Sequence, residues 1–137
     1  MRNKIFTYDI DVRFRDLDAL GHVNHAVFIT YFEHGRINFT KKVFNISDPS
    51  DFSFIMAHIR CDYLKPIKMN DRVTLQMWVL DIGTKSFSFG YKLVDLFNES
   101  MVYATGESVQ VCYDYALGTS IPVSEEMKEK MSGYLIR

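Results

Sequence analysis

The chain has 137 residues, of which 47% are apolar, 15% aromatic and 24% charged. This length predicts one domain over residues 1–137, and the apolar share excludes a mainly disordered chain. The 16 basic and 17 acidic residues give a net charge of −1, so the chain lacks the positive field that holds a nucleic-acid backbone. No nucleic-acid partner is therefore expected.

The cysteine count and the apolar runs indicate the cellular setting. The two cysteines, Cys61 and Cys112, are too few and too far apart for a disulfide framework or a zinc ribbon. Residues 1–8 lack the apolar centre of a leader peptide, and no apolar run approaches the roughly 18 residues of a membrane span. We therefore expect a cytoplasmic protein without a membrane span.

The first elements in chain order are a strand and a long helix. Apolar and polar side chains alternate over residues 8–14, which predicts a strand, and a polar loop follows at 15–24. Residues 25 to about 44 contain no proline and only one glycine, which predicts a helix of roughly 30 Å with Asn24 as its N-cap. Apolar residues cover most of the circumference of its first two turns, so we expect other elements to surround it.

The rest of the chain is predicted to form mainly strands. Alternating or apolar runs indicate strands over residues 52–64, 73–80, 86–95 and 101–115, and Ser124 begins a short C-terminal helix. An α+β domain follows, in which an antiparallel sheet curls around the long helix. This packing explains most of the 11 Phe and 8 Tyr residues. Because free sheet edges favour pairing, we expect a homo-oligomer, foremost a homodimer or homotetramer, with a hexamer also open.

Unusual polar residues gather in the loop before the long helix. Asp16, Asp18, His22, Asn24 and His25 lie within ten positions. A helix start offers unpaired N–H groups and a partial positive charge, which stabilise negative charge on a carbonyl oxygen. Because a carboxylate in this loop could approach the same carbonyl from the other side, the loop favours an acyl-transfer site.

A family resemblance rests on this loop. The sequence D-L-D-A-L-G-H-V-N at residues 16–24, followed by a helix containing Tyr31, resembles hotdog-fold acyl-CoA thioesterases of the 4-hydroxybenzoyl-CoA thioesterase family. The likeness continues through Y-L-K-P at 63–66 and K-S-F at 85–87. It implies a hotdog fold, with a five- to six-stranded antiparallel sheet wrapped around one central helix. It also implies hydrolysis of an acyl-CoA to a free carboxylate and coenzyme A, without a cofactor.

The resemblance also implies roles for individual residues. Asp18 is the expected catalytic carboxylate, and the backbone N–H of His25 is expected to polarise the thioester carbonyl. Lys85 and Ser86 match a turn that in relatives helps to hold the phosphates of coenzyme A, often across a subunit interface. Further substrate contacts are expected from His22, Asn24 and Phe28.

The chemistry of these residues leaves alternatives open. Asp18 could attack the thioester directly and form a mixed anhydride, or it could orient and deprotonate a water molecule. Together with Asp18, His22 and His25 have a spacing that could ligate zinc or iron, but no second ligand pair is evident and no metal is expected. Glu33 is expected to pair with Arg36 along the helix, although a related thioesterase branch uses a helix carboxylate in catalysis.

Two other functions also fit the pattern. Asp18 and His22 could act as the carboxylate and histidine pair of an acyl-thioester hydratase or dehydratase. The chain could also bind an acyl-CoA or an acyl-carrier protein without catalysis. The length and type of the acyl group are not fixed by the sequence.

Overall fold

The computed structural model describes residues 4–136, so residues 1–3 and 137 of the predicted domain lie outside the described residues. Two helices and six strands follow in chain order, with short 3-10 turns at Phe14–Asp16 and Pro49–Asp51. The bounds are β1 (Phe6–Ile10), α1 (His25–Lys42), β2 (Phe54–Tyr63), β3 (Val73–Ile82), β4 (Ser86–Asp95), β5 (Val102–Asp114), β6 (Thr119–Ser120) and α2 (Glu125–Ser132).

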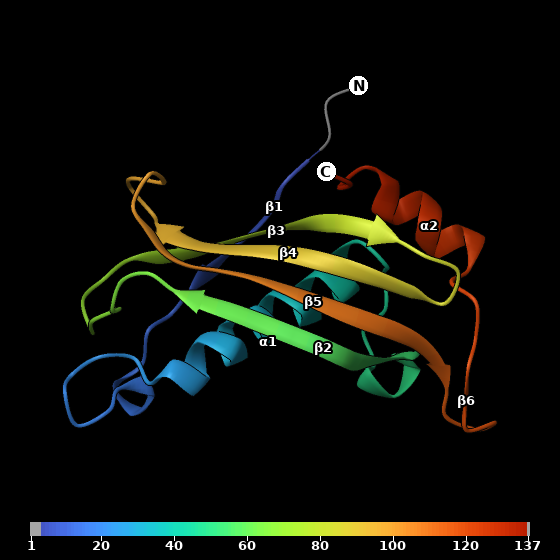
Figure 1. Cartoon of the computed structure of the whole chain (residues 1–137), viewed down its shortest axis with the longest axis horizontal. Helices are drawn as coiled ribbons and strands as arrows, with labels where there is room; N and C mark the ends of the chain where they lie inside the picture. The colour runs from blue at the N-terminus through green and yellow to red at the C-terminus, as the bar shows by residue number, and fades with distance from the viewer. Residues whose placement is uncertain (1–3, 137) are drawn as a thin grey trace.

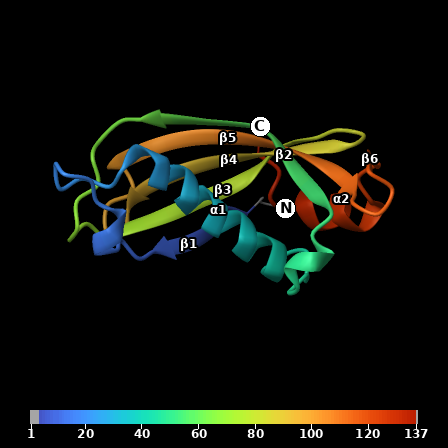
Figure 2. The ribbon, with the colours of Figure 1, turned by 90° about the horizontal axis from the view of Figure 1, so that it is seen from below.

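The strands form one antiparallel sheet in the order β1-β3-β4-β5-β2, and β6 pairs with the end of β5. Figure 1 shows the sheet in front of α1, and Figure 2 shows α1 running along one of its faces. Strand β2 lies at the edge of the sheet, and its one strand partner among the described residues is β5. The predicted α+β architecture with a long central helix is confirmed.

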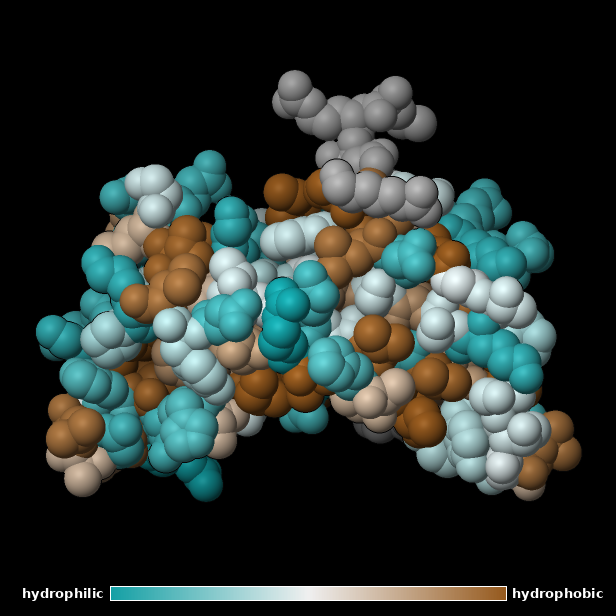
Figure 3. Space-filling model, in the orientation of Figure 1, coloured by the Kyte–Doolittle hydropathy of each residue, from teal (hydrophilic) through white to brown (hydrophobic). Residues whose placement is uncertain are grey.

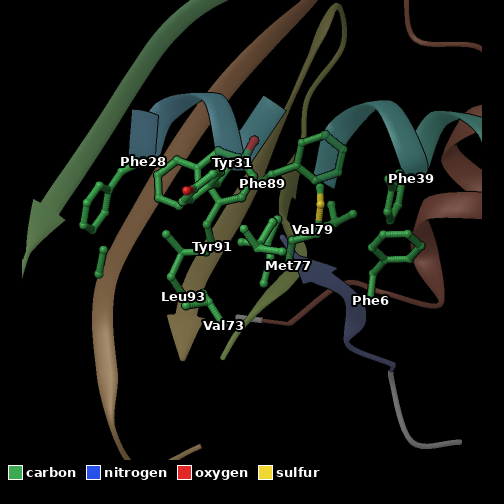
Figure 4. Close-up of a cluster of buried hydrophobic side chains, with 14 of the residues drawn as sticks. Phe6, Phe28, Tyr31, Phe39, Val73, Met77, Val79, Phe89, Tyr91 and Leu93 are labelled. Atoms are coloured by element: carbon green, nitrogen blue, oxygen red, sulfur yellow. The ribbon is translucent and has the colours of Figure 1, made fainter. Parts of the chain in front are cut away.

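One side of α1 packs against the sheet. Phe28, Tyr31, Phe32 and Phe39 are buried there, and Figure 4 shows three of these rings above strand residues such as Met77. Other helix positions, including that of Glu33, are exposed to solvent. The predicted burial of the first turns on all sides is therefore not found in the described chain, because a single sheet covers only one side of the helix.

Aromatic contacts join α1 to the sheet. Phe32 stacks on Tyr91 of β4 with 4.4 Å between ring centroids. Phe39 meets Phe6, Phe89 and Phe44 edge to face at 5.3, 5.0 and 5.4 Å. Such contacts contribute beyond the area that they bury. The predicted use of the many Phe and Tyr residues in helix-to-sheet packing is confirmed.

The first strand is shorter than predicted. It ends at Ile10, because the carboxylate of Asp16 accepts a hydrogen bond from the backbone N–H of Arg13 at 2.9 Å and starts a 3-10 turn. The ring of Phe14, which the alternating pattern places on the buried face, is 80% exposed in this turn.

The surface on the sheet side has no uniform character. Figure 3 shows hydrophobic and hydrophilic residues interspersed over it.

Candidate active site

The loop before α1 closes into a turn around Asp18. The Asp18 N–H donates to the carbonyl of His22 at 2.8 Å, and Oδ1 of Asp18 accepts from the N–H groups of Leu20 and His22 at 2.9 and 3.3 Å. Gly21 closes the turn with a φ of 78°, a conformation that favours glycine. No group in the described chain donates to Oδ2 of Asp18, so this oxygen is held in place with its lone pairs available.

The first turn of α1 keeps one backbone donor available. Asn24 caps the helix as predicted, and its Oδ1 accepts from the N–H of Ala26 at 2.9 Å. The N–H of Val27 donates to the carbonyl of Asn24 at 2.8 Å. Within residues 4–136 the N–H of His25 donates to no group, so it retains its hydrogen-bonding capacity at the positive end of the helix dipole.

The turn and the helix start face one cavity of about 330 Å³. Four of the predicted site residues are brought together in its wall, and the end of β2 with the following loop completes it. Its lining residues are Asp18, His22, Val23, His25, Phe28, Tyr63, Leu64, Lys65 and Pro66. We call it the Asp18 cavity.

Tyr63 joins the end of β2 to the start of α1. Its hydroxyl donates to the carbonyl of His25 at 2.8 Å, and its ring lies edge to face on Phe28 with 5.0 Å between centroids. The sequence pattern predicts no role for Tyr63 or Lys65 in the cavity wall. Their place in Y-L-K-P at 63–66, which the family resemblance includes, is the signal that points to them.

The two acids of the loop differ in their surroundings. Asp16 is 3% exposed, and its carboxylate accepts from the N–H of Arg13 at 2.9 Å and from the hydroxyl of Tyr31 at 2.8 Å. Burial alone raises the pKa of Asp16, but these hydrogen bonds and the charge of Arg13 outweigh it and hold the pKa below its ordinary value. Asp16 therefore fastens the loop to α1, while Asp18 lines the cavity.

The turn between β3 and β4 lies at the other end of the sheet. Ser86 pairs with Val111 of β5, whereas Tyr63 beside the Asp18 cavity pairs with Ala104. Seven positions of an extended strand span about 23 Å. A single chain therefore does not bring Lys85 and Ser86 to the Asp18 cavity.

The structure also bears on the predictions about Glu33, a metal site and a membrane span. Within residues 4–136 no ion pair joins Glu33 to Arg36, and Nη1 of Arg36 donates instead to the hydroxyl of Tyr91 at 3.2 Å. Glu33 lines a different cavity, away from Asp18.

Within residues 4–136 no group of three or more His, Cys, Asp or Glu side chains is placed to hold a metal ion. No helix in that range has the length and apolar character to cross a membrane.

Comparison with known proteins identifies the family. A family model described as "Thioesterase-like superfamily" matches residues 12–131. The chain belongs to this superfamily. The fold of this superfamily member agrees with that of a predicted thioesterase from Bacillus stearothermophilus, with a TM-score of 0.89, 22% identity and 98% of each chain covered. The predicted hotdog thioesterase family is confirmed.

Two known thioesterases also resemble the chain in sequence. A thioesterase from Thermus thermophilus, complexed with coenzyme A and Zn, is 30% identical, with a TM-score of 0.80, over 94% of this chain and 98% of that one. The long-chain acyl-CoA thioesterase FadM of Escherichia coli (strain K12) is 24% identical over 89% of this chain and 93% of its own length.

Proposed function

We propose that this superfamily member hydrolyses acyl-CoA thioesters to a free carboxylate and coenzyme A. The observation that carries the proposal is that Asp18 and the first residue of α1 line the same cavity. A thioesterase needs a group that acts on the carbonyl carbon and a donor for the carbonyl oxygen, and Asp18 and His25 could supply them from the lining of this cavity. The similarity to a long-chain acyl-CoA thioesterase supports this substrate class.

The N–H of His25 is the proposed donor to the thioester oxygen. As the carbonyl carbon becomes tetrahedral, its oxygen gains negative charge, which this N–H and the helix dipole stabilise. A backbone donor does not depend on the side chain at this position. Asn24 supports the donor indirectly, because its cap on the N–H of Ala26 fixes the first turn of α1.

Asp18 acts on the carbonyl carbon in the proposed reaction. Either Oδ2 attacks the carbon, forming a mixed anhydride and releasing the coenzyme A thiolate, after which water hydrolyses the anhydride. Or Oδ2 takes a proton from a water molecule whose oxygen attacks the carbon, and the thiolate then leaves and is protonated. Both routes consume one water and yield a carboxylic acid and a thiol.

Other predicted site residues are proposed to bind the substrate. His22 and Phe28 line the cavity and would contact the acyl group or the thioester. Lys85 and Ser86 are proposed to hold the phosphates of coenzyme A bound to a second copy of the chain, because they lie far from Asp18 of their own copy. This assignment accords with the proposed homodimer or homotetramer.

Replacement of Asp18 by Asn tests the proposal. The change keeps the size of the side chain and removes its charge, so thiol release from acyl-CoA substrates should fall at least about a hundredfold. The melting temperature should stay near that of the wild type. Asp51→Asn is the matched control, because Asp51 is also exposed and lies outside the cavity. Wild-type rates in the Asp18→Asn protein would overturn the assignment.

Two additional assays separate the routes and the competing functions. Single-turnover hydrolysis in oxygen-labelled water places label in the Asp18 carboxylate only on the mixed-anhydride route. Enoyl hydration measured on the same acyl-CoA panel, without thiol release, would identify a hydratase instead. Binding of acyl-CoA with neither reaction would identify a binding module.

A further inference from the structure

The peptide group that joins His25 to Ala26, the first of α1, is held by side chains at both of its polar atoms. Its N–H, that of Ala26, donates to Oδ1 of Asn24 at 2.9 Å. Its C=O, that of His25, accepts from the hydroxyl of Tyr63 at 2.8 Å. A carbonyl oxygen only accepts, so the hydroxyl must be the donor. One neighbouring side chain and one distant side chain therefore fix the orientation of this peptide group.

The preceding peptide group, which joins Asn24 to His25, carries the proposed donor to the thioester oxygen. Its C=O accepts from the N–H of Val27 at 2.8 Å, while its N–H, that of His25, donates to no group in the described part of the chain. Both peptide groups are planar and meet at the Cα of His25, so only two dihedral angles separate them. Movement of the His25 carbonyl therefore changes the direction of the His25 N–H.

Tyr63 brings the sheet into contact with this first helical turn. It is the last residue of β2, where it pairs with Ala104 of β5. Its ring lies edge to face on Phe28 and on His25, with 5.0 and 6.3 Å between centroids. The first turn of a helix lacks part of its backbone hydrogen bonds and frays readily. The bond from Tyr63 ties this turn to a strand that is held by its own ladder.

The Tyr63 hydroxyl keeps its proton for this bond at neutral pH. Partial burial raises the pKa of Tyr63, and the nearby Cys61 raises it further. Cys61 precedes Tyr63 by two residues and so lies on the same side of β2. Burial raises the pKa of the Cys61 thiol as well, so the sulfur stays neutral and is a weaker acceptor than a carbonyl oxygen. The hydroxyl proton therefore goes to His25.

We propose that Tyr63 is a positioning residue of the thioesterase reaction: by holding the carbonyl of His25, its hydroxyl keeps the N–H of the same residue directed at the thioester oxygen. The inference rests on the proposed function. Without the bond, the first turn gains freedom and the N–H is less well aligned. The oxygen carries more negative charge in the transition state than in the bound substrate, so the transition state loses more stabilisation.

Tyr63→Phe tests the role, because it keeps the ring against Phe28 and removes only the hydroxyl. The kcat for thiol release should fall at least about tenfold. KM should stay near the wild-type value, so kcat/KM should fall by the same factor as kcat. A purely structural role would lower the melting temperature and leave kcat unchanged.

Tyr115→Phe is the matched control. The Tyr115 side chain is also exposed, and its hydroxyl donates to a backbone carbonyl at the other end of β2, that of Phe54, at 3.3 Å. This variant removes the same kind of bond from the same strand without touching α1. Its melting temperature should resemble that of Tyr63→Phe, and its kcat should remain that of the wild type. An equal loss of kcat in the two variants would overturn the proposal.

The infrared carbonyl band of a bound thioester reports the donor directly. The probe is the acyl-CoA that the wild type hydrolyses fastest, isotopically labelled at its carbonyl carbon and bound to the Asp18→Asn protein. Binding should move the band to lower frequency, because the His25 N–H polarises the carbonyl. Addition of Tyr63→Phe should reverse part of that shift, whereas addition of Tyr115→Phe should not.

The outcomes separate this inference from the proposed function. If Asp18→Asn abolishes thiol release while Tyr63→Phe keeps the wild-type kcat, or leaves the carbonyl band unmoved, the role of Tyr63 is refuted and the proposed function stands. If Asp18→Asn hydrolyses acyl-CoA at the wild-type rate, the proposed function fails and this inference fails with it.

Discussion

The hydroxyl of Tyr31 donates to the carboxylate of Asp16 across 2.8 Å, and this bond fastens the loop before α1 to the second turn of the helix. Burial and the neighbouring carboxylate raise the pKa of Tyr31, so its hydroxyl stays protonated as a donor. Asp18 follows Asp16 by two residues, and within the described part of the chain its side chain accepts only from the N–H groups of its own turn. The position of Asp18 over the cavity therefore depends on a bond made by its neighbour.

Removal of the Tyr31 hydroxyl should destabilise the protein. Tyr31→Phe keeps the buried ring but leaves the Asp16 carboxylate without one donor, which costs about 1.5–3 kcal/mol for a bond to a charged group. Urea unfolding measures the loss. Tyr8→Phe is the control, because the Tyr8 hydroxyl makes no hydrogen bond in the described chain. Equal free energies of unfolding for the two variants would contradict the anchoring role.

Asp16 should also make stability depend on acid. Its folded pKa is held below the ordinary value, so its stabilising contribution is complete above the unfolded pKa of about 4 and is lost as the pH falls through the folded pKa. The free energy of unfolding should therefore fall below about pH 4. In Asp16→Asn this acid-dependent decrease should be smaller, and stability at neutral pH should already be reduced. An identical pH profile in the two proteins argues against this linkage.

The helix cap at Asn24 should affect stability and catalysis together. Asn24→Ala removes the acceptor for the Ala26 N–H and should cost about 1 kcal/mol. Because the same turn carries the His25 N–H, the rate of thiol release should fall as well. Asn24→Asp retains a side-chain acceptor and should restore most of both quantities. Loss of stability without any loss of rate would separate the cap from the proposed oxyanion donor.

A glycine allows α1 to approach the middle of the sheet. A Cβ atom at Gly106 of β5 would lie 2.6 Å from the ring of Phe32 and 2.7 Å from the backbone oxygen of Arg60. Gly106→Ala should therefore destabilise the protein by about 1–3 kcal/mol, because the backbone of β2 cannot move aside without breaking its pairing. Gly133→Ala is the control, since nothing lies within 4 Å of the corresponding Cβ. Thermal unfolding compares the two.

Local sequence rules predict most of the secondary structure. The cap residues place the starts of α1 and α2 at His25 and Glu125, and alternation places β4 at residues 86–95, as the structure has them. The same rules extend β1 too far, because the turn that ends it depends on a side chain, that of Asp16, which bonds back to Arg13. Periodicity carries no information about such a contact.

The candidate site is only partly visible in the sequence. The loop and the helix start are contiguous, so their meeting around Asp18 and His25 can be predicted from local spacing. The contribution of Tyr63 depends on β2 ending beside the first turn of α1, a tertiary relation between residues 38 positions apart. Likewise, hydrogen bonds join Arg36 of α1 to Tyr91 of β4, and Tyr91 to Ser108 of β5, although no spacing rule connects these residues.

The placement of Lys85 at the far end of the sheet from Asp18 has a genetic consequence. If each active site takes its carboxylate from one copy and its phosphate contact from another, two defective chains can complement each other. An Asp18→Asn chain supplies a normal Lys85, and a Lys85→Ala chain supplies a normal Asp18. Co-expression of the two should then restore part of the thiol release that either chain alone lacks, in proportion to the mixed assemblies formed.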